Sequence, residues 1–347
     1  MNQKHAEQEI AVLGIDLGKR SFHLHGVDRS GKEVIRKKMN RKQLLSFMTS
    51  LKPCLVGMEA CGGSHHWARQ FQALGHEVRL MSPQFVKPYV KSNKNDYLDA
   101  EAICEAVQRP NMRFVPIKSA EQQDIQSLHR ARSLAISQRT AQINQVRGLL
   151  LEYGLVLPQG AHVVRKALPD ILEDAENALS FAMRELLADL REELVHLDER
   201  IAAYDRKINL TAKQNDACQR LMTIPGVGPL IATALIAAVG DVHVFKSGRQ
   251  MAAWLGLVPR QRSTGGRPIL GRISKRGDGY LRTLLIHGAR AVVRLAGNKT
   301  DRRSRWVATL AQRRGHNIAA VALANKNIRA AWALLTRAEV YQVIEAV

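Results

Sequence analysis

The sequence lacks the features that mark membrane proteins and disulfide-rich proteins. No apolar run approaches the roughly 20 residues that a membrane-spanning helix needs, and the first residues contain no apolar core of a signal peptide. None of the four cysteines is spaced as a CxxC pair, so neither a zinc ribbon nor a disulfide framework is expected. We therefore expect a soluble protein of the cytoplasm, with no membrane partner.

Acidic residues are also scarce. The 347 residues include 52 Lys and Arg against 31 Asp and Glu, a net charge of +21, and a hydrophobic content of 46% indicates a folded chain. Residues 244–347 contain 20 Lys and Arg but only 4 Asp and Glu, whereas residues 165–200 contain 5 basic and 10 acidic residues. The excess favours a polyanionic partner, most commonly a nucleic acid, and it predicts that the C-terminal third makes most of the contact.

The pattern of apolar residues predicts three regions. Strand and helix patterns alternate along the N-terminal region, which predicts an α/β domain at residues 1–117. Residues 118–214 contain two long helix patterns, and apolar residues of the second recur at alternating spacings of four and three, as in a coiled coil. That stripe pairs with the first long helix, with a second subunit, or with both. Residues 215–347 predict a mostly helical domain.

Four acidic residues form the first candidate site. Asp16 ends the first strand pattern, Glu59 ends a later buried strand, and Asp96 and Asp99 share one face of a helix. Carboxylates that converge repel one another and bind protons unless a cation lies among them. Oxygen ligands suit Mg²⁺ or Mn²⁺, which hold substrate phosphates in phosphodiester chemistry. Each acid alone also fits an ordinary turn or helix start, so the prediction depends on their ordered combination.

A glycine turn forms the second candidate site. The run Pro225-Gly226-Val227-Gly228-Pro229 separates two apolar helix patterns. Its glycines permit a tight backbone that exposes N–H groups near a helix N-terminus, as in a helix-hairpin-helix that contacts the DNA backbone. The alternative is a tight turn packed in the core. Gly226 and Gly228 are therefore candidate nucleic-acid contacts.

A serine among arginines forms the third candidate site. Ser263 is followed closely by Gly265 and Gly266, which would let the backbone approach DNA. Guanidinium groups beside a serine could orient a phosphate and stabilise the charge that develops when the hydroxyl attacks it. The alternative is a flexible basic loop with an incidental serine. The predicted nucleic-acid-binding residues of this segment are all basic: Arg260, Arg262, Arg267, Lys275, Arg276 and Arg282.

These motifs resemble the transposases of the "insertion sequence 110" family. Asp16, Glu59 and the run Lys94-Asn95-Asp96-Tyr97-Leu98-Asp99-Ala100 are similar to the family's N-terminal catalytic domain. Residues 224–291 resemble its C-terminal transposase domain, and the Arg-Ser-Thr-Gly-Gly form is similar to the 1111 subgroup. The resemblance covers nearly the whole chain in the expected order, with the coiled coil between the two halves.

The resemblance implies both a fold and a chemistry. The fold is RNase H-like, of the RuvC type, for residues 1–117, followed by a coiled coil and a mostly α transposase domain with a helix-hairpin-helix. Asp16, Glu59, Asp96 and Asp99 would be the family's DEDD carboxylates, binding Mg²⁺ or Mn²⁺. Ser263 would be the nucleophile on a DNA phosphate, with Thr264 and Ser274 as neighbouring hydroxyls.

The resemblance also implies partners. Members use a structured non-coding guide RNA to choose donor and target DNA, and they act as homo-oligomers whose active sites are shared between subunits. The expected function is RNA-guided DNA recombination that mobilises an insertion element, with a dimer or tetramer acting at the bacterial nucleoid.

Three other functions remain open. A metal-dependent nuclease of DNA junctions needs only the four carboxylates and forms no covalent serine intermediate. A sugar-kinase-like ATPase is suggested by Gly14-Ile15-Asp16-Leu17-Gly18, although no convincing second Asp-x-Gly phosphate loop accompanies it. An architectural protein would use the glycine turn and the basic helices, and it would bind DNA equally well without the carboxylates.

Overall fold

The chain divides into two compact units, Met1–Ala120 and Glu121–Val347. The computed structural model describes residues 9–91 and 95–343, so Lys94 of the predicted catalytic run lies outside the described residues. The boundary predicted at residue 117 lies near this division, whereas the one predicted at residue 214 falls inside the second unit. The division into three domains stays a prediction.

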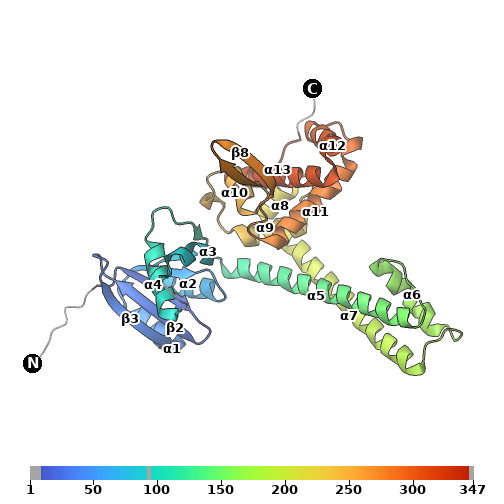
Figure 1. The fold of residues 1–347 in the computed structure, drawn as a ribbon, viewed down its shortest axis with the longest axis horizontal. Helices are drawn as coiled ribbons and strands as arrows, with labels where there is room; N and C mark the ends of the chain where they lie inside the picture. Colours follow the sequence, from blue (N-terminus) through green and yellow to red (C-terminus); the bar gives the residue numbers. More distant parts are fainter. Residues whose placement is uncertain (1–8, 92–94, 344–347) are drawn as a thin grey trace, which may run out of the picture. The chain divides into compact units, whose positions relative to one another are not determined.

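The first unit is built on a mixed sheet of six strands in the order β3-β2-β1-β4-β5-β6 (Figure 1). β1, β2 and β3 pair antiparallel, β4 and β5 run parallel to β1, and the short β6 is antiparallel to β5. The strands are β1 (Val12–Leu17), β2 (Ser21–Val27), β3 (Glu33–Asn40), β4 (Leu55–Glu59), β5 (Glu77–Met81) and β6 (Phe114–Val115). The helices are α1 (Arg41–Ser50), α2 (Ser64–Ala73), α3 (Pro83–Val86) and α4 (Asp96–Val107). The predicted α/β character of this region is confirmed.

The two faces of this sheet pack on different helices. Successive side chains of a strand point to opposite faces. Leu13 and Ile15 of β1 belong to the buried cluster that includes side chains of α1 and α2. Val12 belongs to a separate cluster with side chains of α4, which therefore covers the opposite face. Gly14 and Asp16 share the α4 face with Val12.

Two glycines let α4 lie close to the sheet. A Cβ atom at Gly14 would lie 2.3 Å from the carbonyl oxygen of Ala100, and one at Gly57 would lie 2.8 Å from the Cβ atom of Val107. A larger residue would push α4 away, because a backbone oxygen cannot rotate aside as a side chain can. Each glycine lies two residues before a predicted metal-binding acid, so the face that admits α4 also carries Asp16 and Glu59.

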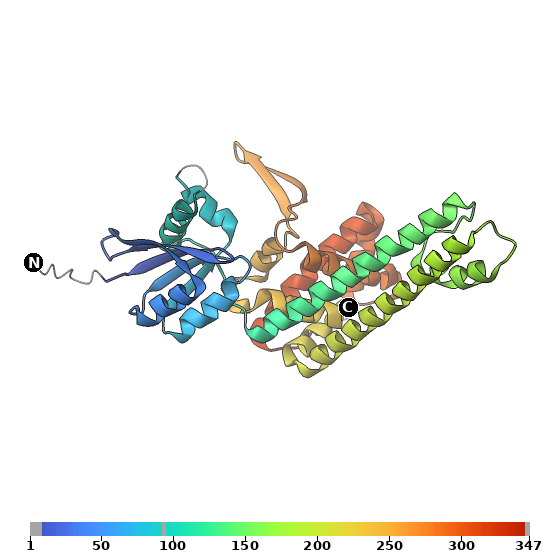
Figure 2. The same cartoon turned by 90° about the horizontal axis from the view of Figure 1, so that it is seen from below.

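The second unit contains the two long helices predicted from the sequence. α5 (Ala120–Glu152) and α7 (Phe181–Gln214) lie side by side (Figure 2). Arg132 pairs with Asp205, and Arg139 pairs with Asp198 at 2.8 Å, so the partners advance along α5 while they go back along α7. The two helices are therefore antiparallel.

The apolar stripe of α7 faces the interior of this helix pair. Its most buried members recur at heptad spacing: Leu187, Leu194, Ile201 and Ile208. Leu187 and Leu194 share a buried cluster with Ile143 and Leu150 of α5, and α6 (Ala161–Glu173) adds Val164 and Leu168 to it. The predicted pairing of the two long helices is confirmed, and pairing with a second subunit stays a prediction.

The rest of the second unit is helical around one large apolar core. Its helices are α8 (Asp216–Met222), α9 (Pro229–Val239), α10 (Gly248–Trp254), α11 (Gly279–Leu295), α12 (Arg302–Arg314) and α13 (His316–Arg337). The flexible loop that the sequence offered as the alternative around Ser263 does not form, because this segment is an antiparallel hairpin of β7 (Pro259–Thr264) and β8 (Arg267–Ile273). Gly265 and Gly266, both with positive φ, form the two-residue turn that such hairpins favour. The hairpin projects away from the helices of its unit (Figure 2).

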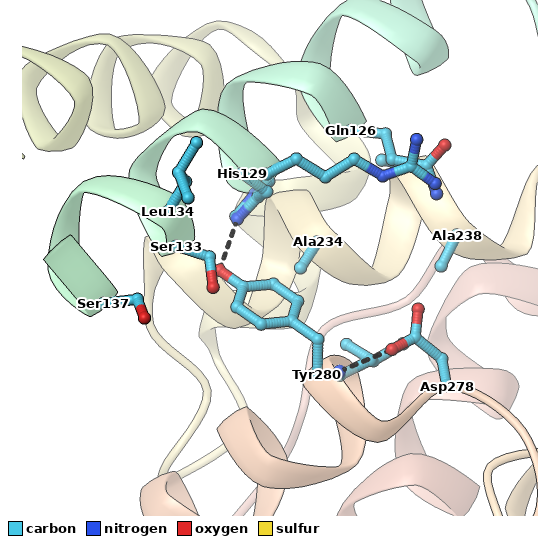
Figure 3. Close-up of a pocket in the computed structure, with 12 residues that line it drawn as sticks. Gln126, His129, Ser133, Leu134, Ser137, Ala234, Ala238, Asp278 and Tyr280 are labelled. Carbon is cyan, nitrogen blue, oxygen red and sulfur yellow. Dashed lines mark hydrogen bonds between the residues drawn. The ribbon is translucent and has the colours of Figure 1, made fainter.

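A buried histidine joins α5 to α9 and α11. The Oγ1 atom of Thr233 lies 2.9 Å from His129 Nε2 and 2.8 Å from the carbonyl oxygen of Pro229. The hydroxyl of Tyr280 lies 3.0 Å from His129 Nδ1 (Figure 3). Both ring nitrogens of His129 therefore have a hydrogen-bond partner. The side chains of His129 and Tyr280 line part of a cavity of about 530 Å³ between these three helices.

No helix among the described residues is long and apolar enough to cross a membrane.

The close approach of α4 predicts a large cost for one added methyl group. Gly14→Ala should lower the free energy of unfolding by about 1–3 kcal/mol, because the new Cβ meets backbone atoms of α4. Gly148→Ala is the matched control, since Gly148 lies exposed within α5 and a Cβ there meets nothing within 4 Å. That change should stabilise the chain by about 0.5–1 kcal/mol. Urea unfolding measures both, and equal effects would contradict the packing argument.

The histidine network predicts a loss of stability in mild acid. Burial, followed by the nearby charge of Arg132, lowers the pKa of His129 from 6.5 to about 4. The unfolded chain therefore binds this proton first, and the contribution that is complete above pH 6.5 is lost as the pH falls toward 4. In urea unfolding across this range, His129→Gln should reduce the pH dependence by up to about 1.4 kcal/mol per pH unit. Replacement of the exposed His196 serves as the control, and an unchanged slope in His129→Gln would contradict the prediction.

Candidate active site

The sheet brings two of the predicted acids to neighbouring strand ends. Asp16 lies near the carboxyl end of β1, and Glu59 is the last residue of β4. Ile15 and Met58 are partners in the parallel register of these strands, so Asp16 and Glu59 occupy adjoining positions on one edge. Both are half-buried.

The first turn of α4 brings the other two acids to this edge. Asp96 is the first residue of α4, and Asp99 follows within the same turn. Asn95 caps the helix, and its side-chain oxygen accepts a hydrogen bond from the backbone N–H of Tyr97. Ala100, the residue after Asp99, lies against Gly14. The close packing that the glycines allow therefore delivers the helix acids toward the strand acids.

Electrostatic coupling shows that the acids act on one another. The pKa of Asp16 is raised by burial, then by the negative charges of Asp99 and Asp96. The pKa of Glu59 is raised by burial, then by Asp16 and Asp99. A cation among these carboxylates would relieve both penalties.

The donor chemistry of the four acids suits a hard divalent cation. All four offer carboxylate oxygens, the ligands that Mg²⁺ and Mn²⁺ prefer. As the side chains lie, no three His, Cys, Asp or Glu of residues 9–91 and 95–343 are grouped closely enough to hold a metal ion. The acids therefore fit the ion in kind, and their side chains would have to turn inward to coordinate it.

Ser263 lies on the exposed hairpin of the second unit. Its hydroxyl accepts a hydrogen bond of 2.8 Å from the side-chain N–H of Gln261. Ser263 is paired with Pro268, whereas Arg262 is paired with Ile269 and the next residue, Thr264, with Arg267. Because neighbouring residues of a strand point to opposite faces, the hairpin places these arginines on the face opposite Ser263.

The base of the hairpin is held by close backbone packing. A Cβ atom at Gly277 would lie 2.0 Å from the carbonyl oxygen of Trp254, and one at Gly256 would lie 2.3 Å from that of Arg276. Arg282 donates to the carbonyl oxygens of Leu255 and Arg276, each at 3.1 Å. The guanidinium of Arg282 thus supports the hairpin base. The nucleic-acid role predicted for Arg282, and for Arg276 and Lys275 beside it, stays a prediction.

The predicted glycine turn joins α8 to α9. Gly226 has φ +89°, and a Cβ atom there would lie 2.8 Å from the carbonyl oxygen of Gly288 on α11. The turn is therefore packed against α11, as the alternative prediction of a core turn expects. A Cβ atom at Gly228, the N-cap of α9, meets nothing within 4 Å, so only this glycine is open to a ligand. DNA contact by either glycine stays a prediction.

The structure adds three residues beside the acids that the sequence analysis missed. His23 of β2 is the antiparallel partner of Asp16. The Nδ1 atom of His23 lies 3.7 Å from the Asp96 carboxylate, and the His23 ring contacts the ring of Tyr97 edge to face. The guanidinium of Arg36 lies over the Tyr97 ring. Only the register of β1 with β2 reveals His23, since nothing in its local sequence marks it.

Comparison with known proteins gives the same assignment at both ends of the chain. The family model described as "Transposase IS116/IS110/IS902 family" matches residues 218–305, and a "Transposase" model for the DEDD domain of IS110 elements matches residues 13–155. A "Probable family 20 transposase" of Pseudomonas aeruginosa is 55% identical over 96% of this chain and 99% of its own length. The "Transposase for insertion sequence element IS1111A" of Coxiella burnetii is 49% identical over 98% of this chain and 93% of its own.

A third relative extends the comparison. The "Transposase for insertion sequence element IS1328" of Yersinia enterocolitica is 42% identical over 96% of this chain and 98% of its own length. The matches span both the acids of the first unit and the helical second unit. The chain belongs to the IS110 family of DNA transposases, the enzymes that mobilise insertion elements.

Proposed function

We propose that this transposase cuts and rejoins DNA with two groups, a metal site on Asp16, Glu59, Asp96 and Asp99 and a nucleophile at Ser263. The observation that carries the proposal is the convergence of the acids on one edge of the sheet, where Asp96 and Asp99 raise the pKa of Asp16, and Asp16 and Asp99 raise the pKa of Glu59. The strand order β3-β2-β1-β4-β5, with β1–β3 antiparallel, supports the RNase H-like, RuvC-type fold that the resemblance implies. Bound Mg²⁺ or Mn²⁺ would supply Lewis-acid stabilisation at the scissile phosphate.

The part of Ser263 is to conserve the energy of the broken bond. Its hydroxyl attacks the phosphorus, a phosphoserine ester forms, and the DNA strand leaves with a free hydroxyl. A second DNA hydroxyl then attacks the phosphoserine, which restores a phosphodiester and releases the serine. Exposure of Ser263 on a narrow hairpin supports this role, because a DNA strand can reach it. The proposed assembly is a homo-oligomer, as the resemblance to the family implies.

The proposed partners are DNA and a structured guide RNA. The net charge of +21 supports a polyanionic partner, and Arg260, Arg262 and Arg267 give the hairpin a basic face. The RNA guide rests on the resemblance to the family. Recombination in vitro should require the transcript of the non-coding DNA that flanks the element, and efficient recombination without RNA would contradict this part of the proposal.

The metal role predicts a separation of binding from cleavage. Asp16→Ala and Asp99→Ala should each abolish strand cleavage while leaving DNA affinity within a few-fold of the parent, since the basic segments of the second unit bind the backbone. Cleavage of labelled DNA in Mg²⁺ and gel-shift titration measure the two properties. The exposed Asp189 on α7 offers a control, and Asp189→Ala should keep both. Full cleavage by either site variant would remove the acids from the mechanism.

The serine role predicts a covalent adduct. Ser263→Ala should bind DNA normally but form no protein–DNA adduct and no recombinant, because the attacking oxygen is gone. Denaturing gels with labelled DNA detect the adduct, and Thr264→Val and Ser274→Ala are the controls that should retain it. An adduct that persists in Ser263→Ala and vanishes in a control would move the nucleophile to that residue. Cleavage without any adduct in the parent would favour a metal-dependent junction nuclease.

A further inference from the structure

The first turn of α4 is attached to the sheet through the ring of Tyr97. On one side the ring meets His23 of β2 edge to face, with centroids 4.7 Å apart. On another side the guanidinium of Arg36 on β3 lies 5.3 Å from the ring centroid, within the range of a cation–π contact. Tyr97 lies between Asp96 and Asp99 in the chain, so the contacts of its ring fix the position of this turn.

Asp96 depends on this attachment more than the other acids do. It is the first residue of α4, where a helix frays, and its side chain is 58% exposed. The His23 side chain is only 5% exposed, and its Nδ1 atom lies 3.7 Å from Asp96 Oδ2. A buried imidazole thus lies beside one oxygen of the most exposed acid. Since His23 is also the partner of Asp16, it lies between the strand acid and the helix acid.

We propose that His23 is a positioning residue that orients Asp96 for metal binding, with Tyr97 and Arg36 fixing the turn that carries it. The inference rests on the proposed metal role of the four acids. Partners of this kind hold one oxygen of a metal-binding carboxylate and leave the other for the ion, and their loss typically costs about 10–100-fold in metal affinity. Without His23, Asp96 keeps its chemistry and loses its orientation.

The same strand supplies a matched control. His25 lies two residues further along β2, is also buried, and faces the same side of the sheet. Its Nδ1 atom lies 3.4 Å from Glu33 of β3, which is not one of the four acids. Loss of His25 removes a buried imidazole from β2 without touching Asp96.

Mn²⁺ binding to the full chain, measured by calorimetry without DNA, tests the inference. His23→Ala should weaken binding about 10–100-fold, and His25→Ala should leave it within about twofold. His23→Asn should recover most of the affinity, because its amide N–H can donate to the Asp96 carboxylate from the same position. Tyr97→Phe should bind as the parent does and Tyr97→Ala should not, since the ring rather than the hydroxyl makes the described contacts.

Amide hydrogen exchange gives a second readout that does not depend on metal. Exchange at residues 96–100 should be faster in His23→Ala than in His25→Ala when both are folded. Parent-like Mn²⁺ affinity in His23→Ala, an equal loss in His25→Ala, or no recovery in His23→Asn would each overturn the inference alone. A parent chain that binds no Mn²⁺ would remove the proposed metal role, and this inference with it.

Discussion

Repulsion between carboxylates is the constraint that the packing of the first unit has to overcome. The charge of Asp99 raises the pKa of Asp16 and of Glu59, and a fold free to relax would separate these acids. Packing opposes this, because α4 rests directly on Gly14 and Gly57 and its apolar side chains are buried against the sheet. Each glycine precedes a strand acid by two residues. Because side chains alternate along a strand, the glycine that contacts α4 and the acid that follows it lie on the same face of the sheet. The energy of helix-on-sheet packing thus maintains an arrangement that electrostatics opposes, and a cation can use it.

The hairpin of the second unit meets a different constraint. A two-stranded ribbon is marginally stable by itself, and every residue of β7 is exposed. Its order comes from its base, where Gly256 and Gly277 bring backbone segments together and Arg282 bonds two carbonyl oxygens across the junction. The tip is consequently left without a packing partner. Such a construction suits a segment that must reach a phosphate on another molecule.

The sequence predicts what is periodic and local. Alternating strand and helix patterns give the α/β unit, and the heptad stripe gives the pairing of α7 with α5. The acids follow from strand ends and from Asp-x-x-Asp spacing. The hairpin is missed because Gly265-Gly266 fits a flexible loop as well as it fits the two-residue turn of a hairpin. His23 could not be predicted, since its role depends on Asp96, a partner far along the chain. For Gly226 the sequence left two alternatives open, and only its contact with Gly288 on α11 favours the packed turn.

The hairpin also changes which residues can take part in the proposed serine chemistry. Guanidinium groups around Ser263 would have let a single loop bind the phosphate and neutralise its developing charge. The strand register instead gives the serine face Gln261 and Pro268, and it gives the opposite face Arg262 and Arg267. Those arginines can hold DNA beside the hairpin, yet on this geometry they do not surround the attacked phosphorus. In the proposed mechanism, the register therefore leaves Ser263 the part of the nucleophile on one face of the hairpin and gives Arg262 and Arg267 the part of holding DNA on the other.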